Sequence, residues 1–230
     1  MSFYPYLILI LGAVSLTLFL VLRDRNGSVE ALILKTITSF LFLALAFTSA
    51  IINDKADNIS YYLLIIMGLI CGLIGDIVLD LKIIYKESSS LYQHAGMVSF
   101  LIGHIFYLSA IFTYFGFHWL PLVIALAAAV AINLVSKFVL KYNFKEHTID
   151  CYLYAFFLSY MSTQSIYAAI NAGGSATTIL LAIGAALFML SDLVLLKTYY
   201  EGKASRPYII VNHTLYYGAQ FLIALSILFI

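Results

Sequence analysis

The stretch from Gly68 to Asp80 reads Gly-Leu-Ile-Cys-Gly-Leu-Ile-Gly-Asp-Ile-Val-Leu-Asp and lies within an apolar run long enough to cross a bilayer. Two glycines and two aspartates recur in it every four residues, at positions 68, 72, 76 and 80, so on a helix they share one face. Glycine on that face lets a second helix approach closely, and the aspartates then face protein instead of lipid. Because a carboxylate inside a membrane is costly, this pattern indicates a functional site.

A second stretch repeats this pattern far along the chain. Residues 188–196 read Phe-Met-Leu-Ser-Asp-Leu-Val-Leu-Leu, with Asp192 in the middle of an apolar segment. We expect the rest of the chain to act as a scaffold that brings Asp76 and Asp192 together.

The composition is that of a membrane protein. Apolar residues make up 63% of the 230 residues and charged residues only 10%, far from the balance of a soluble domain. The net charge is +1 and the sequence contains no basic run, so no nucleic-acid partner is expected from it. The first apolar segment lacks a positively charged start and a clear cleavage site, so we expect a retained span, not a signal peptide.

Apolar segments of about 20 residues recur from end to end. They predict an all-α protein, a single polytopic membrane domain over residues 1–230, with about eight transmembrane helices in one bundle. The expected spans are 4–22, 30–52, 60–81, 95–115, 118–139, 149–170, 177–197 and 207–229.

Basic residues gather on one side of the expected membrane. Of the 12 basic residues, all but two lie in or beside the loops that follow spans one, three, five and seven. They are Arg23, Arg25, Lys82, Lys86, Lys137, Lys141, Lys145, Lys197, Lys203 and Arg206. The positive-inside rule places these loops in the cytoplasm and both termini outside it, and short loops favour a bacterial inner membrane.

Polar residues of four spans share one depth. Asp76 precedes Lys82 by six residues, about 9 Å along a helix axis. Asp192 lies a similar distance before Lys197, and spans two and eight carry Lys35 and His213 at the same level. These four groups are therefore expected about two turns below the cytoplasmic surface.

Spans three and seven are also alike in sequence, and each is followed by a span with a His-x-x-Tyr pair. The pairs are His104 with Tyr107 and His213 with Tyr216. We interpret this as two parallel four-helix repeats related by an axis along the membrane normal, which would place the two aspartates face to face.

These residues resemble a known family. The chain is similar to the YhhN family of integral membrane proteins, whose animal members are lysoplasmalogenases. The similarity extends over most of the chain and is sharpest at 72–79, 103–107, 187–192 and 216–223. The family usually has a basic residue followed by proline early in span two, whereas here Lys35 is followed by Thr36.

The resemblance implies hydrolysis of the vinyl ether of a lysoplasmalogen to a fatty aldehyde and a glycerophospho-alcohol. The reaction needs a proton on the alkene carbon and then attack by water on the oxocarbenium ion, hence one carboxylic acid and one carboxylate. Two buried carboxyl groups that share a site can supply both forms. We expect Asp76 and Asp192 to be this catalytic pair, in either order of roles.

The expected substrate is a lysophospholipid that enters from the bilayer with its phosphate near the basic loops. No cofactor and no metal is expected. The residues expected to bind the substrate are Lys35, Asp80, His104, Tyr107, His213, Tyr217 and Gln220.

Other interpretations of these residues stay open. Both catalytic aspartates could serve structure alone, Asp80 could cap its helix, Lys35 could snorkel to the surface, and His104 could simply bond between helices. As functions, one alternative is a metal-dependent lipid hydrolase in which two histidines and two aspartates hold zinc. The other is a lipid or small-solute transporter without enzymatic activity.

Overall fold

The fold is a bundle of long helices, as expected. A computed structural model describes residues 3–23, 29–200 and 205–230, and these residues form eight long helices and no strand. The helices are α1 (Tyr4–Leu22), α2 (Val29–Asn53), α3 (Ile59–Ile84), α4 (Ser89–Phe115), α5 (Trp119–Leu134), α6 (Thr148–Asn171), α7 (Ala176–Tyr200) and α8 (Arg206–Ser226). Short helical turns cover Ala56–Asn58, Lys86–Ser88, Val135–Val139, Lys145–His147 and Ile227–Phe229.

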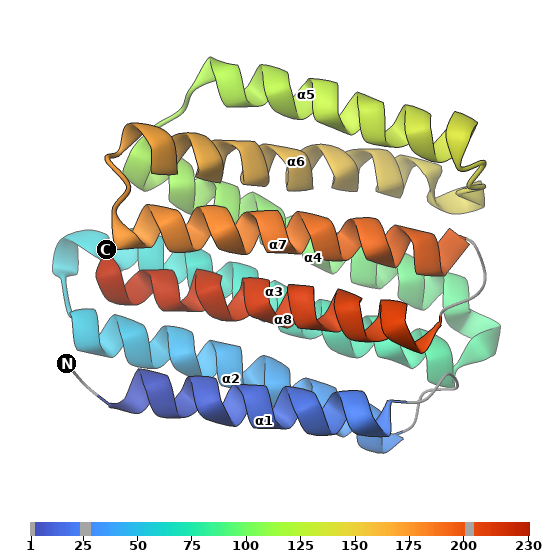
Figure 1. Cartoon of the computed structure of the whole chain (residues 1–230), viewed down its shortest axis with the longest axis horizontal. Helices are drawn as coiled ribbons and strands as arrows, with labels where there is room; N and C mark the ends of the chain where they lie inside the picture. The colour runs from blue at the N-terminus through green and yellow to red at the C-terminus, as the bar shows by residue number, and fades with distance from the viewer. Residues whose placement is uncertain (1–2, 24–28, 201–204) are drawn as a thin grey trace.

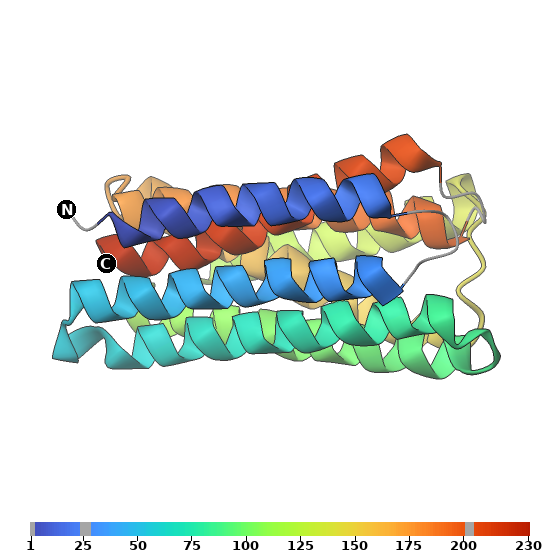
Figure 2. The ribbon, with the colours of Figure 1, turned by 90° about the horizontal axis from the view of Figure 1, so that it is seen from below.

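All eight helices run along the long axis of the molecule, in an elongated bundle (Figure 1). Figure 2 shows the same bundle from below, with α1 and α8 on one side and α3 and α4 on the other. The start of α1 and the end of α8 lie at the same end of the bundle, as an even number of crossings requires.

The contacts of the first four helices recur in the last four. α3 packs along α4 as α7 packs along α8, and α2 contacts α3 as α6 contacts α7. Between the halves, α4 packs against α6 and α8 packs against α2. These pairs are equivalent if each helix corresponds to the fourth helix after it, so the packing agrees with two parallel four-helix repeats.

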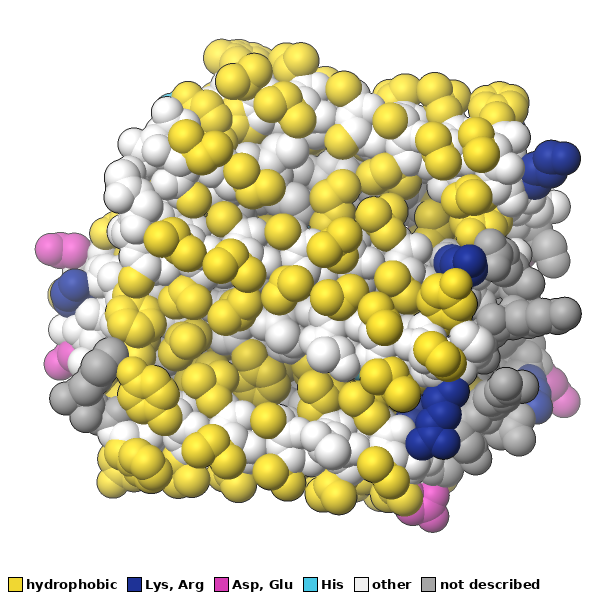
Figure 3. All heavy atoms as spheres, viewed as in Figure 1, with side chains coloured by type: hydrophobic (Ala, Val, Ile, Leu, Met, Phe, Trp, Pro, Cys, Tyr) yellow, Lys and Arg dark blue, Asp and Glu magenta, His cyan; other side chains and the backbone are white. Residues whose placement is uncertain are grey.

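The outer surface is that of a multi-pass membrane protein. Six of the described helices, namely α1, α2, α3, α4, α5 and α7, are long and apolar enough to cross a membrane. Hydrophobic side chains cover the flank of the bundle, and charged side chains gather at its two ends (Figure 3). The two more polar helices, α6 and α8, each contact at least three others and bury polar residues such as Gln164 and Gln220 there.

Two helix ends differ from the expected spans by more than three residues. α4 begins at Ser89, ahead of the expected start at 95, because the helix continues through polar residues beyond its apolar part. His94 in this extension lies 2.6 Å from the Asp150 carboxylate of α6. At the other difference, α5 ends at Leu134 and a π-helical turn, Val135–Val139, completes the expected span.

The orientation in the membrane stays a prediction of the loop charges. Arg25 and Lys203, which contributed to it, lie outside the described residues, and the side chain of Lys145 is not described either. Figure 3 shows most of the visible basic side chains at the end of the bundle where α1 and α7 end and α8 begins.

Candidate active site

Asp76 is buried in α3 and receives donors from two other helices. Lys35 of α2 places its Nζ atom 3.3 Å from Asp76 Oδ1. The hydroxyl groups of Ser39 and Tyr216 each donate to Asp76 Oδ2 at 2.7 Å. Lys35 and Ser39 lie four residues apart on α2, so they present both groups on one face. An opposite charge and two hydrogen-bond donors together stabilise Asp76 as a carboxylate.

Asp80 shares the same lysine. Lys35 Nζ lies 3.1 Å from Asp80 Oδ1, and Arg23 at the end of α1 lies 2.5 Å from Asp80 Oδ2. Asp80 is 4% exposed and Lys35 is also 4% exposed, so neither reaches the surface. The structure therefore disagrees with two of the open interpretations: Lys35 does not snorkel to the headgroups, and Asp80 does not serve as a solvated helix end.

Glycine on α3 makes room for polar side chains behind Asp76. A Cβ atom at Gly72 would collide with the amide of Gln220, and one at Gly68 would collide with the ring of Tyr107. Tyr107 donates to Gln220 Oε1 at 2.8 Å, and Gln220 in turn donates to the Tyr216 hydroxyl at 3.1 Å. The glycine face thus holds a buried chain of hydrogen bonds that ends on Asp76.

Asp192 on α7 has different surroundings. The Tyr154 hydroxyl of α6 donates to Asp192 Oδ2 at 2.5 Å, and the neighbouring Ser191 donates to Oδ1 at 3.3 Å. Asn212 of α8 holds the backbone here by donating to the Ser191 carbonyl at 2.7 Å. No described basic side chain forms an ion pair with Asp192, and its donors are uncharged hydroxyl groups.

The two aspartates share one polar cavity of about 140 Å³. Asp76 and Asp192 both line it, and so do the rings of Tyr154 and Tyr216. The volume is enough for several water molecules. The same cavity therefore contains two carboxyl groups with different partners and has room for water.

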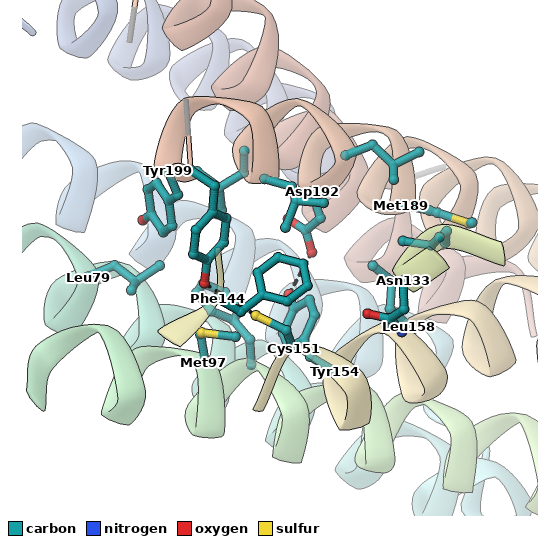
Figure 4. Close-up of a pocket in the computed structure, with 17 residues that line it drawn as sticks. Leu79, Met97, Asn133, Phe144, Cys151, Tyr154, Leu158, Met189, Asp192 and Tyr199 are labelled. Atoms are coloured by element: carbon teal, nitrogen blue, oxygen red, sulfur yellow. Dashed lines mark hydrogen bonds between the residues drawn. The ribbon is translucent and has the colours of Figure 1, made fainter. Parts of the chain in front are cut away.

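Asp192 also lines a second, apolar pocket of about 90 Å³ (Figure 4). This pocket lies between α4, α5, α6 and α7, and Figure 4 shows Asp192 directed toward the side chains of Phe144 and Tyr154. Leu193 on its wall is also exposed on the outer surface of the bundle, so the pocket lies close to the apolar flank. Asp192 therefore stands where a polar and an apolar space meet.

The sequence comparison identifies the family. The family described as YhhN matches residues 30–227, which include both aspartates. The chain belongs to the YhhN family. No curated protein and no solved structure matches it. The matched region of this YhhN chain begins after α1, so Arg23 lies outside that region, whereas its partner Asp80 lies within it.

The expected substrate-binding residues of this YhhN protein divide into two groups. Lys35, Asp80 and His213 line the polar cavity. Tyr217 instead donates to the Lys35 carbonyl at 3.1 Å, so it positions α2. The others, Tyr107, Gln220 and His104, are buried away from the cavity wall.

The zinc alternative finds little support in the placement of the histidines. His213 Nδ1 donates to the Ile209 carbonyl at 2.8 Å. His104 packs its ring against the rings of Tyr154 and Phe188, and within the described part of the chain neither of its nitrogens has a hydrogen-bond partner. Among the described residues, the group of possible metal ligands that lies close together is a different one, His94, His147 and Asp150, near the start of α6.

Arg23, Ser39 and Tyr154 also lie at the site, although the sequence pattern assigned none of them a role there. The position of Ser39, one helical turn after Lys35, was a usable signal, because the two share a face. Arg23 looked like an ordinary loop charge. Tyr154 was one of 18 tyrosines, so its residue type carried little information.

Proposed function

We propose that this protein is a lysoplasmalogenase-type hydrolase that cleaves the vinyl ether of a lysophospholipid within the membrane. The observation that carries the proposal is the cavity that Asp76 and Asp192 both line. Membership in the YhhN family supports the reaction class, and the apolar pocket beside Asp192 supports an apolar substrate chain.

The partners of the two carboxyl groups support a division of roles. Asp76 has Lys35 and two hydroxyl donors, an arrangement that favours the ionised form. Asp192 has hydroxyl partners and no described ion pair, an arrangement suited to a carboxylic acid that gives up a proton. We assign Asp192 as the general acid and Asp76 as the carboxylate.

The reaction then follows from these roles. Asp192 delivers its proton to the alkene carbon that does not carry the ether oxygen, and the carbon that does becomes an oxocarbenium centre. Asp76 stabilises this cation electrostatically and accepts a proton from the attacking water. In the hemiacetal that forms, the bond between its central carbon and the glycerol oxygen breaks while the hemiacetal hydroxyl gives its proton to Asp192. The glycerol oxygen takes up the proton held by Asp76, so the products are an aldehyde and an alcohol and both aspartates return to their starting forms. Tyr154 stabilises the carboxylate left on Asp192.

The substrate position follows from the two adjoining spaces. The chain would occupy the apolar pocket, which Leu193 separates from the apolar flank of the bundle, and the glycerol would occupy the polar cavity. On this proposal the substrate comes from the cytoplasmic leaflet, provided that the basic end of the bundle faces the cytoplasm as the loop charges predict.

The test is aldehyde release from a lysoplasmalogen by purified protein in detergent or nanodiscs. We expect Asp76→Asn and Asp192→Asn each to lower turnover by a factor of about 100 or more, the usual range for removal of an acid or base. Asp57→Asn, which changes an exposed aspartate of the Ala56–Asn58 turn, is the matched control. Wild-type turnover in both site variants, with both folded, would refute the proposal.

A further inference from the structure

The charges on the wall of the polar cavity do not all pair with one another. Among the described residues, three basic side chains line the cavity, those of Arg23, Lys35 and Lys82. Arg23 pairs with Asp80, and Lys35 pairs with Asp76 and Asp80. Within the described part of the chain, Lys82 forms no ion pair, so it is the cation of this wall that an incoming anion can meet.

Neighbouring helices hold the Lys82 ammonium in place. Its Nζ atom donates to Gln93 Oε1 of α4 at 2.9 Å and lies 3.5 Å from the centroid of the Tyr199 ring of α7. An ammonium has three N–H donors, and the hydrogen bond to Gln93 uses one. Gln93 and Tyr199 thus fix the charge from two sides while donors stay available toward the cavity.

We propose that Lys82 binds the phosphate of a single-chain phospholipid whose glycerol lies in the polar cavity. This inference rests on the proposed function, because it takes the ligand to be the lysolipid that reaches Asp192. If Asp192 enters as the neutral acid, the described residues of the cavity wall include three basic groups against the carboxylates Asp76 and Asp80. The excess of one positive charge matches one phosphodiester.

The spacing along α3 agrees with this assignment. Lys82 follows Asp76 by six residues, which is about 9 Å along the helix axis. The distance from the vinyl ether, through the glycerol and the phosphate, to an ammonium group that binds the phosphate is similar. A vinyl ether beside the aspartates therefore leaves the phosphate at the level of Lys82, nearer the headgroups, where a lysine is well placed. Lys35 is less suited, because two carboxylates already bind it.

The experiment measures binding with a probe that the proposed reaction cannot consume. We would use a 1-alkyl lysophosphoethanolamine, which lacks the vinyl ether, and a 1-alkylglycerol with the same chain, both with protein in nanodiscs. The variants are Lys82→Met, which keeps the apolar stem, and Lys82→Arg, which keeps the charge. The control is Lys86→Met, which removes an exposed lysine just after α3.

We expect Lys82→Met to weaken binding of the alkyl lysolipid about tenfold or more, the usual worth of a hydrogen bond to a charged group. Lys82→Arg should retain most of the affinity, Lys86→Met should bind as the wild type does, and alkylglycerol should bind all variants alike. Equal lysolipid binding by Lys82→Met and wild type would overturn the proposal. So would lower turnover at unchanged affinity, which would make Lys82 the counter-ion of Asp192.

One further outcome tests whether the ligand is a lipid, and another distinguishes failure of the phosphate site from failure of the hydrolase proposal. Water-soluble glycerophosphoethanolamine that binds as tightly as the lysolipid would overturn a lipid ligand, because the apolar chain would then contribute nothing. If the protein releases no aldehyde and yet shows the Lys82-dependent affinity for the alkyl lysolipid, the hydrolase proposal fails and the phosphate site stands.

Discussion

Lys35→Met tests the charge arrangement on which the site depends. The substitution removes one ammonium and leaves a side chain of similar length in α2. Asp76 and Asp80, which are 2% and 4% exposed, both lose this partner, and Asp80 keeps Arg23. The main effect should therefore arise at Asp76, whose remaining donors are the uncharged hydroxyl groups of Ser39 and Tyr216.

The expected size follows from breaking a buried ion pair. Removal of one partner of such a pair costs about 3–5 kcal/mol, because a buried charge is left without compensation. For a chain of this size each kcal/mol shifts the unfolding midpoint by about 2–4 °C, which predicts a fall of roughly 6–20 °C. In the double variant Lys35→Met with Asp76→Asn, the neutral amide needs no cation, so most of the loss should be recovered.

The measurement is thermal unfolding in a single detergent. Its readout is the fraction of protein that stays monodisperse as the temperature rises. Lys86→Met serves as the control, because it removes an exposed charge at the same end of the bundle. If Lys35→Met unfolds at the same temperature as Lys86→Met, or if Asp76→Asn restores nothing, the buried ion pair does not stabilise the fold.

Two other predictions concern Asp192. Tyr154→Phe removes the hydroxyl that donates to Asp192 at 2.5 Å and should lower the turnover number about 10- to 100-fold while the unfolding temperature stays near that of the wild type. Unchanged turnover would contradict the role given to Tyr154. Ala155→Trp fills the apolar pocket that Ala155 lines and should raise the KM for a long-chain lysoplasmalogen about tenfold or more, whereas Ala155→Val should change it little. Equal KM values in the two variants would show that the apolar chain of the substrate does not bind in this pocket.

The fold could be predicted from the sequence more completely than the site. Apolar segments separated by short polar ones decide the number of helices, and the glycine and aspartate pattern of 68–80 decides which face of α3 is buried. The partners of Asp80 could not be found in the same way, because they depend on how closely α1 approaches α3. A basic residue at a helix end, such as Arg23, is equally compatible with the headgroups and with a buried ion pair.

The two repeats explain how one arrangement can supply both an acid and a carboxylate. Equivalent helices, α3 and α7, carry Asp76 and Asp192, and two such carboxyl groups in one cavity resist ionising together. The helices packed in equivalent positions against them differ. α2 presents Lys35 and Ser39 to its aspartate, whereas α6 presents Tyr154. The difference in charge between the two sites thus comes from α2 and α6, and on the proposed mechanism these helices decide which aspartate gives the proton.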